Sequence, residues 1–324
     1  FSKIGFAYLA GSIVIYAVQF LAAMVGKKFV PGVMADANSS FIVLMLTMYG
    51  ISMPFMGWLV SRIPAQKIEE RKMTAGQWII AFLMCYGLMY AGNLIGTALT
   101  FGIGMVKGTG VDNPLVSTVM QLNPWVTFII AVLIAPTAEE LLFRKLLTER
   151  IVKYGELAAV LASGLFFGLF HGNLNQFSYA FLLGLFLGFI YVKTGKLRYT
   201  IGLHMAINFI GSSLGTWMLR VTGYMDTMET LTEFLNTKNL AVLADLGNGI
   251  VGMFIFGSYA SLILMMAGAR LILTWLNRKK FVCCAPEEKV ASLGKKKVAV
   301  MIGNPGILLY GAFWIGIMIW QLLQ

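Results

Sequence analysis

Long apolar runs separated by short polar segments dominate the chain. A helix needs about 20 mostly apolar residues to cross the hydrocarbon core of a bilayer. On that basis we predict spans at residues 5–26, 41–61, 78–103, 125–147, 157–171, 177–193, 199–219, 248–276 and 304–323. The stretch 104–124 contains Gly, Asn and Pro and predicts an interfacial loop with one amphipathic turn.

The composition agrees with this pattern. Of the 324 residues, 58% are hydrophobic and only 12% charged, which excludes an ordinary soluble domain. The first apolar segment, about 22 residues long, exceeds the core of a signal peptide and is kept as a span. The predicted fold class is an all-α, polytopic membrane helix bundle with eight or nine transmembrane helices.

The basic residues predict the orientation, because cytoplasmic loops are enriched in Lys and Arg. If the N-terminus and the loops after even-numbered spans share one side, that side collects 17 of the 25 basic residues and the other side five. We predict a cytoplasmic N-terminus and an external C-terminus. The net charge of +11 then fits anchoring to anionic lipid headgroups and requires no nucleic-acid partner.

The chain divides at one composition shift. Residues 1–276 form a predicted membrane domain whose core is 125–219, 277–303 form a basic cytoplasmic linker, and 304–324 add a further C-terminal helix. The adjacent Cys283 and Cys284 lie in this linker without a nearby His. A cytosolic location argues against a disulfide between them.

Candidate chemistry begins with Glu139, Glu140 and Arg144, which lie within the fourth apolar run. Charge at membrane depth is costly, so such residues pair with one another or line a wet cavity. Glu140 and Arg144 are four residues apart on one helix face and predict an ion pair. Glu139 points about 100° away and is left free. The residue Pro136 lacks the N–H that would bond the Val132 carbonyl, which needs another partner.

Both histidines of the chain, His171 and His204, also lie in predicted membrane segments. Phe167 precedes His171 by four residues, and Asn208 follows His204 by four, so each pair shares a helix face. His171 would lie near the external surface if its helix spanned fully, far from His204. We therefore predict that the helix 157–171 is short and ends inside the membrane, where the polar residues 171–176 line a water-filled cavity.

In their order and spacing, Glu139-Glu140-x-x-x-Arg144, Phe167-x-x-x-His171 and His204-x-x-x-Asn208 resemble the motifs of the CPBP family. This family comprises intramembrane glutamic endopeptidases related to the type II CAAX prenyl endopeptidases and to bacteriocin-processing and immunity proteins. The resemblance covers residues 135–211. One departure is Lys145, where many members carry Gly.

The resemblance implies an intramembrane peptidase acting on a membrane-associated peptide or protein in a bacterial plasma membrane. Glu139 would be the general base for a water that His171 also holds. His204 and Asn208 would stabilise the tetrahedral intermediate. Glu140 and Arg144 would support the site, and Phe167 would pack beside His171.

Three alternatives stay open. The chain could be a scaffold or sensor member of the same family, or a transporter that uses Glu139 and the histidines as a proton relay. A zinc site formed by Glu139, His171 and His204 is the third. The sequence lacks the His-Glu-x-x-His spacing, so we predict a site without a metal or other cofactor.

Overall fold

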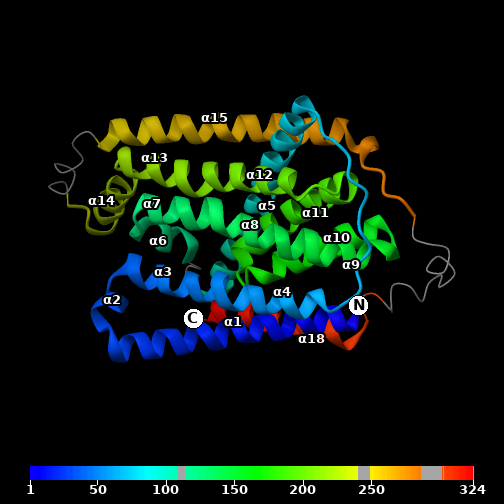
Figure 1. Cartoon of the computed structure of the whole chain (residues 1–324). Helices are drawn as coiled ribbons and strands as arrows, with labels where there is room; N and C mark the ends of the chain where they lie inside the picture. Colours follow the sequence, from blue (N-terminus) through cyan, green and yellow to red (C-terminus); the bar gives the residue numbers. More distant parts are fainter. Residues whose placement is uncertain (109–113, 240–248, 286–300, 302, 324) are drawn as a thin grey trace.

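The computed structural model describes residues 1–108, 114–239, 249–285, 301 and 303–323. Regular secondary structure in this part of the chain is entirely helical, and most long helices run side by side (Figure 1). The first half comprises α1 (Ser2–Phe29), α2 (Pro31–Ala35), α3 (Ala37–Thr47), the π-helix η1 (Met48–Ser52), α4 (Met53–Ser61), α5 (Ala75–Lys107) and α6 (Pro114–Gln121).

A single long helix follows, in which α-helical and π-helical turns alternate. Its parts are α7 (Pro124–Thr127), η2 (Phe128–Ile134), α8 (Ala135–Glu140), η3 (Leu141–Leu146), α9 (Leu147–Ile151) and the 3-10 turn η4 (Val152–Tyr154). The rest comprises α10 (Glu156–Phe170), α11 (Leu174–Thr194), α12 (Leu197–Asn208), the π-helix η5 (Phe209–Leu214), α13 (Gly215–Val221), α14 (Tyr224–Thr237), α15 (Gly249–Leu276), the 3-10 turn η7 (Arg278–Lys280) and α18 (Pro305–Leu323).

The predicted all-α membrane bundle is confirmed. Among the described residues, seven helices are long and apolar enough to cross a membrane. Each coincides with one of the nine predicted spans. The other two predictions correspond to α10, which has only 15 residues, and to the continuous helix 197–221. The second is absent from the seven because polar residues such as Arg198, His204 and Asn208 lower its hydropathy.

The short helix α10 and its partner α11 form an antiparallel hairpin. Its open end is closed by an ion pair between Glu156 and Lys193. At its tip the chain reverses at Gly172, whose φ of 59° favours glycine. At 1.5 Å per residue, α10 is about 22 Å long and too short for a 30 Å hydrocarbon core. The prediction that this helix is short is confirmed, whereas its end inside the membrane at a water-filled cavity stays a prediction.

The segments with most basic residues meet at one end of the bundle. The Gln66 N–H donates to the Glu149 carbonyl at 2.7 Å, and the Arg71 N–H donates to the Thr194 carbonyl at 2.8 Å. The ring of Phe1 also contacts Tyr154 at this end, where the N-terminus lies (Figure 1). Of the predicted basic linker, residues 286–300 and 302 lie outside the described part of the chain.

The final helix, predicted as an addition to the core, is part of it. α18 runs parallel to α1, and their backbones touch at Gly5 and Gly306, where a Cβ on Gly5 would lie 2.2 Å from the Gly306 carbonyl carbon. Tyr310 stacks on Phe166 of α10 with ring centroids 4.5 Å apart and donates to the Phe166 carbonyl at 3.1 Å. α1 and α18 therefore support the hairpin from one side.

Candidate functional site

The helix 124–154 departs from α-helical geometry on both sides of its two glutamates. The π-turns η2 and η3 flank α8, which carries Pro136, Glu139 and Glu140. Proline lacks a backbone N–H, so a helix must change its hydrogen bonding around it. Another π-turn, η1, likewise precedes a proline, Pro54. Single π-turns within α-helices are frequent at functional sites.

Glu140 and Arg144 form the predicted ion pair. Their Oε1 and Nη2 atoms are 3.0 Å apart, and both side chains are completely buried. The guanidinium also stacks on the ring of Phe167, 4.5 Å from its centroid. Its nitrogens have no hydrogen bond of good geometry to any described residue, so Glu140 and the aromatic ring are its main compensation.

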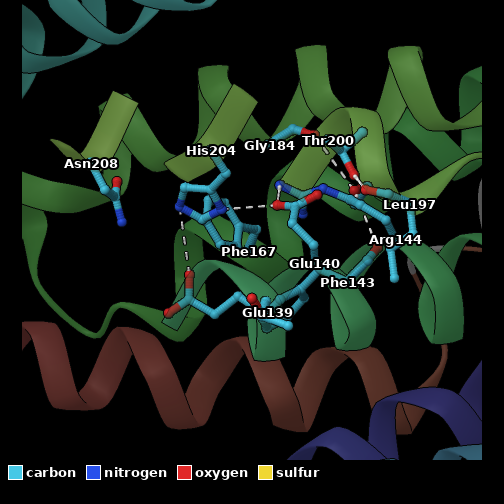
Figure 2. A network of polar contacts seen from close by, with 12 residues as sticks. Glu139, Glu140, Phe143, Arg144, Phe167, Gly184, Leu197, Thr200, His204 and Asn208 are labelled. Carbon is cyan, nitrogen blue, oxygen red and sulfur yellow. Dashed lines mark hydrogen bonds and ion pairs between the residues drawn. The ribbon is translucent and has the colours of Figure 1, made fainter. Parts of the chain in front are cut away.

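His204 connects the two glutamates (Figure 2). Its Nδ1–H donates to Glu140 Oε1 at 3.0 Å, which orients the ring. The opposite nitrogen, Nε2, then faces Glu139 Oε2 at 3.8 Å. This separation exceeds a direct hydrogen bond, and a bridging water is the ordinary way to connect such groups. Glu139 is not paired with Arg144, in agreement with the sequence prediction.

Phe167 contacts three of the predicted site residues, namely Arg144, His171 and His204. Its ring centroid lies 4.8 Å from that of His171 and 5.5 Å from that of His204, edge-on in both cases. His171 donates from Nδ1 to the Phe167 carbonyl at 2.8 Å, and no described residue bonds its Nε2. The structure shows no direct contact between His171 and Glu139, so the predicted water shared by these two residues stays a prediction.

Asn208 lies apart from the glutamates in Figure 2 and has a backbone partner instead. Its Nδ2 donates to the Ala131 carbonyl in η2 at 2.8 Å. The sequence had indicated Val132 as the residue whose carbonyl Pro136 leaves free. In the π-turn, however, Ala135 N–H bonds Ile130, five residues earlier, so the missing proline bond is the one to Ala131. The expectation assumed α-helical spacing, which does not hold at the end of η2.

Three residues that the sequence did not single out lie around the glutamates. Tyr49 and Tyr179 lie near Glu139, and the Thr200 hydroxyl donates a hydrogen bond to Glu140. Tyr179 comes from α11 and its ring lies 6.2 Å from that of His171. Tyrosine within an apolar span usually places its hydroxyl near a polar partner, and that was the available signal.

A fourth missed residue is Glu149. It was placed beyond the predicted span 125–147, but the helix continues to Tyr154 and buries it. It pairs with Lys145 at 2.8 Å and accepts a hydrogen bond from the Tyr191 hydroxyl at 2.9 Å. Lys145, the position where many CPBP members carry Gly, therefore pairs with a residue on its own helix. It lies outside the cluster formed by Glu139 and Glu140.

A three-ligand metal site is not formed within the described ranges: no three His, Cys, Asp or Glu side chains come together there. In the described part of the chain Glu139, His171 and His204 therefore do not form such a set, although His171 and His204 both lie edge-on to the ring of Phe167. Metal independence itself stays a prediction.

Chelation tests that prediction. We expect cleavage by the detergent-solubilised protein to be unchanged, within about twofold, after prolonged treatment with a strong zinc chelator, because water activation would fall to Glu139 rather than a metal. The measurement is cleavage rate together with elemental analysis of the purified protein. Activity that is lost on chelation and restored by zinc would assign ligand roles to Glu139 and the histidines.

Comparison with known proteins gives one family. Residues 121–210 match the family model described as Type II CAAX prenyl endopeptidase Rce1-like. The matched segment contains all seven predicted site residues and runs from the end of α6 through α12 into η5. The searches of curated proteins and of solved structures gave no match.

Proposed function

We propose that this chain is an intramembrane peptidase of the CPBP family, because residues 121–210 match the Rce1-like type II CAAX prenyl endopeptidase model. It would hydrolyse a peptide bond in a membrane-associated peptide or protein, with Glu139 activating the attacking water. A scaffold member of the family would need the helices to fold. It would not need Glu139 to remain unpaired with Arg144.

One observation carries the proposal. Glu140 compensates Arg144 and orients His204, while Glu139, one residue earlier, is spared from both tasks and faces the His204 Nε2 at 3.8 Å. A structural ion-pair network would not need the second carboxylate. A general base needs a carboxylate that is free to take a proton, next to a group that can hold the water or the developing charge.

The proposed reaction runs through this pair. Glu139 takes a proton from a water molecule, and the water oxygen attacks the carbonyl carbon of the scissile bond. The resulting oxyanion accepts a hydrogen bond from the Nε2–H of His204, which for this step carries a proton on both ring nitrogens because its Nδ1–H donates to Glu140. Glu139 then returns the proton to the leaving nitrogen and the C–N bond breaks. A carboxylic acid and an amine are released, and the acid gives up its proton to the amine or to water. His171 would hold the water from the side opposite to His204, through its free Nε2.

The cavity that admits water would be reached at the tip of the α10–α11 hairpin. His171 and Asn173 lie at this tip, and Asn173 accepts a hydrogen bond from the Gln176 N–H at 3.3 Å. A helix that ends inside the membrane is tolerated where its backbone lines a cavity or is covered by protein. A substrate segment entering there would expose its peptide bond next to His171.

The seven long apolar helices make the chain an integral membrane protein. For its orientation we propose a cytoplasmic N-terminus in a bacterial plasma membrane, since the basic segments share one end of the bundle. That end includes the contacts of Gln66, Arg71 and Lys193. Anionic headgroups of the cytoplasmic leaflet would be its lipid partners.

Thiol labelling checks the orientation. In a variant without native cysteines, we expect Gln66→Cys to be shielded from a membrane-impermeant thiol reagent in intact cells, and Leu235→Cys in α14 to be labelled. Permeabilised cells are the control, in which both positions should react. Labelling of residue 66 before permeabilisation, with protection of residue 235, would reverse the proposed topology.

Comparative proteomics tests the activity itself. Membranes that contain the wild-type chain are compared with membranes that contain Glu139→Ala at equal expression. We expect at least one membrane-associated peptide or protein to accumulate uncut in the variant, with its two products present only in the wild type. Identical peptide profiles in the two membranes would contradict a peptidase function.

A further inference from the structure

The Ala131 carbonyl has lost its normal partner for a covalent reason. At the end of the π-turn η2 the Ile130 carbonyl accepts from the N–H five residues later, that of Ala135. The residue five positions after Ala131 is Pro136, which has no N–H. An unpaired carbonyl inside a membrane protein is costly, because no lipid group can replace the lost donor. The amide of Asn208 supplies that donor from another helix, at 2.8 Å.

This hydrogen bond is one of two that join the same two helices. α12 contacts the helix 124–154 at His204, through Glu140, and one turn later at Asn208, through Ala131. The order of these contacts shows that the two helices are antiparallel. Just beyond the Asn208–Ala131 hydrogen bond, the rings of Phe128 and Phe209 add an edge-on contact with centroids 6.2 Å apart. Glu139 and the Nε2 of His204 face each other between these two hydrogen bonds.

Two hydrogen bonds fix the position of α12 relative to the helix 124–154 more tightly than one. A single bond at His204 would let α12 rotate or slide about that point, and the 3.8 Å separation between Glu139 and Nε2 would vary with it. The second bond sets the height of α12 against α8. Catalytic geometry tolerates little variation, and displacement by about 1 Å can cost roughly 10²-fold in rate.

We propose that Asn208 is a positioning residue for the Glu139–His204 pair, whose amide replaces the backbone N–H that Pro136 lacks. The resemblance to the CPBP family implies another role, that of a direct hydrogen-bond donor to the oxyanion. The inference rests on the proposed peptidase function for its activity readout alone, since the bond and its effect on stability exist whatever reaction is catalysed.

The two roles predict different behaviour when Pro136 is changed. Pro136→Ala restores a backbone N–H five residues after Ala131 and so provides the carbonyl with a partner within its own helix. Asn208 should then become largely dispensable. If Asn208 instead touches the oxyanion, its removal costs the same whether or not Pro136 is present. A double-mutant cycle separates these cases, because it isolates the coupling between two positions.

The first readout is thermal stability of the wild type, Asn208→Ala, Pro136→Ala and the double variant in detergent. We expect Asn208→Ala to lower Tm by several degrees in the wild-type background and by less than half as much in the Pro136→Ala background. The matched control is Asn277→Ala at the end of α15, where the amide donates to the Leu273 carbonyl, also at 2.8 Å. Its effect should be the same in both backgrounds.

The second readout is the initial rate of appearance of those membrane peptides whose formation is lost in Glu139→Gln. We expect Asn208→Ala to lower this rate by about 10²-fold, and the double variant to recover to within about fivefold of Pro136→Ala alone. An equal loss of rate from Asn208→Ala in both backgrounds, with equal changes in Tm, would overturn the inference and return Asn208 to the oxyanion.

The outcomes also separate this inference from the function it rests on. If no peptide depends on Glu139 but the stability cycle shows the expected coupling, the peptidase function fails and the Asn208–Pro136 relation stands. If peptides depend on Glu139 and neither cycle shows coupling, the function stands and the positioning role is wrong. Should Asn208→Ala not fold at all, recovery of folded protein in the double variant supports the inference, and its absence contradicts it.

Discussion

Glu140→Gln is expected to fold poorly, with a clearly lower melting temperature and low yield in addition to lost activity. The substitution removes the charge that compensates Arg144, a side chain with no exposed surface. The remaining contact of the guanidinium, with the ring of Phe167 at 4.5 Å, is weaker than an ion pair. Removing one partner of a buried pair typically costs about 3–5 kcal/mol. Thermal unfolding in detergent measures this loss.

Glu149→Gln is the matched control. Glu149 also lies on the helix 124–154 and pairs with a residue four positions away, since Lys145 Nζ is 2.8 Å from its Oε1. The Lys145 side chain, however, is 41% exposed and stays hydrated when its partner is neutralised. Such a pair is worth about 0–1 kcal/mol. Equal losses of stability in Glu140→Gln and Glu149→Gln would show that burial of Arg144 is not the cause.

The double variant Glu140→Leu/Arg144→Met probes the same pair from the other direction. Replacing both charges by apolar groups removes the uncompensated cation, and such replacements are often neutral or stabilising. We expect Tm to recover part of what either single variant loses. Activity should not return, because His204 would have lost the carboxylate that holds its Nδ1–H.

Glu139→Gln is expected to behave in the opposite way, with cleavage reduced at least 10³-fold and Tm within a few degrees of wild type. Glutamine keeps the size of the side chain but cannot take a proton from water. Glu139 makes no ion pair with Arg144, whose charge is compensated by Glu140. Removing a charge that is costly to bury should not destabilise the fold. Cleavage rate and melting temperature are measured on the same preparation.

The contrast between the two glutamates has a definite contradicting outcome. If Glu139→Gln is the unstable variant, while Glu140→Gln folds normally and is inactive, the assignment of roles is reversed. Glu140 would then be the base, and Glu139 would support Arg144. Because adjacent residues on one helix lie at nearly the same depth in the membrane and both variants change the same functional group, depth does not account for a difference between them.

The sequence predicted the bundle and the pairing of Glu140 with Arg144 because both follow from local rules. Apolar runs of about 20 residues predict spans, and residues four apart share a helix face. The short helix before His171 was predicted from a conflict of depths between the two histidines. The hairpin of α10 and α11, reversing at Gly172, resolves that conflict.

Other features escaped the sequence because they depend on helix register or on distant segments. π-turns change which carbonyl Pro136 leaves unpaired, so Ala131 rather than Val132 receives the Asn208 amide. Tyr8 and Tyr310, from α1 and α18, donate to the Leu142 and Phe166 carbonyls at 2.7 and 3.1 Å. These contacts join residues more than 130 positions apart, and no local pattern indicates them.

The most direct test of the central claim, that Glu139 activates water for peptide hydrolysis, is isotope incorporation. Membranes containing the wild-type chain, Glu139→Gln or Glu149→Gln are incubated in ¹⁸O-labelled water, and the newly formed peptide C-termini are analysed by mass spectrometry. The account predicts ¹⁸O-labelled C-termini with the wild type and with Glu149→Gln, and their loss with Glu139→Gln. Labelled C-termini that form equally well with Glu139→Gln, or that form with none of the three, would contradict it.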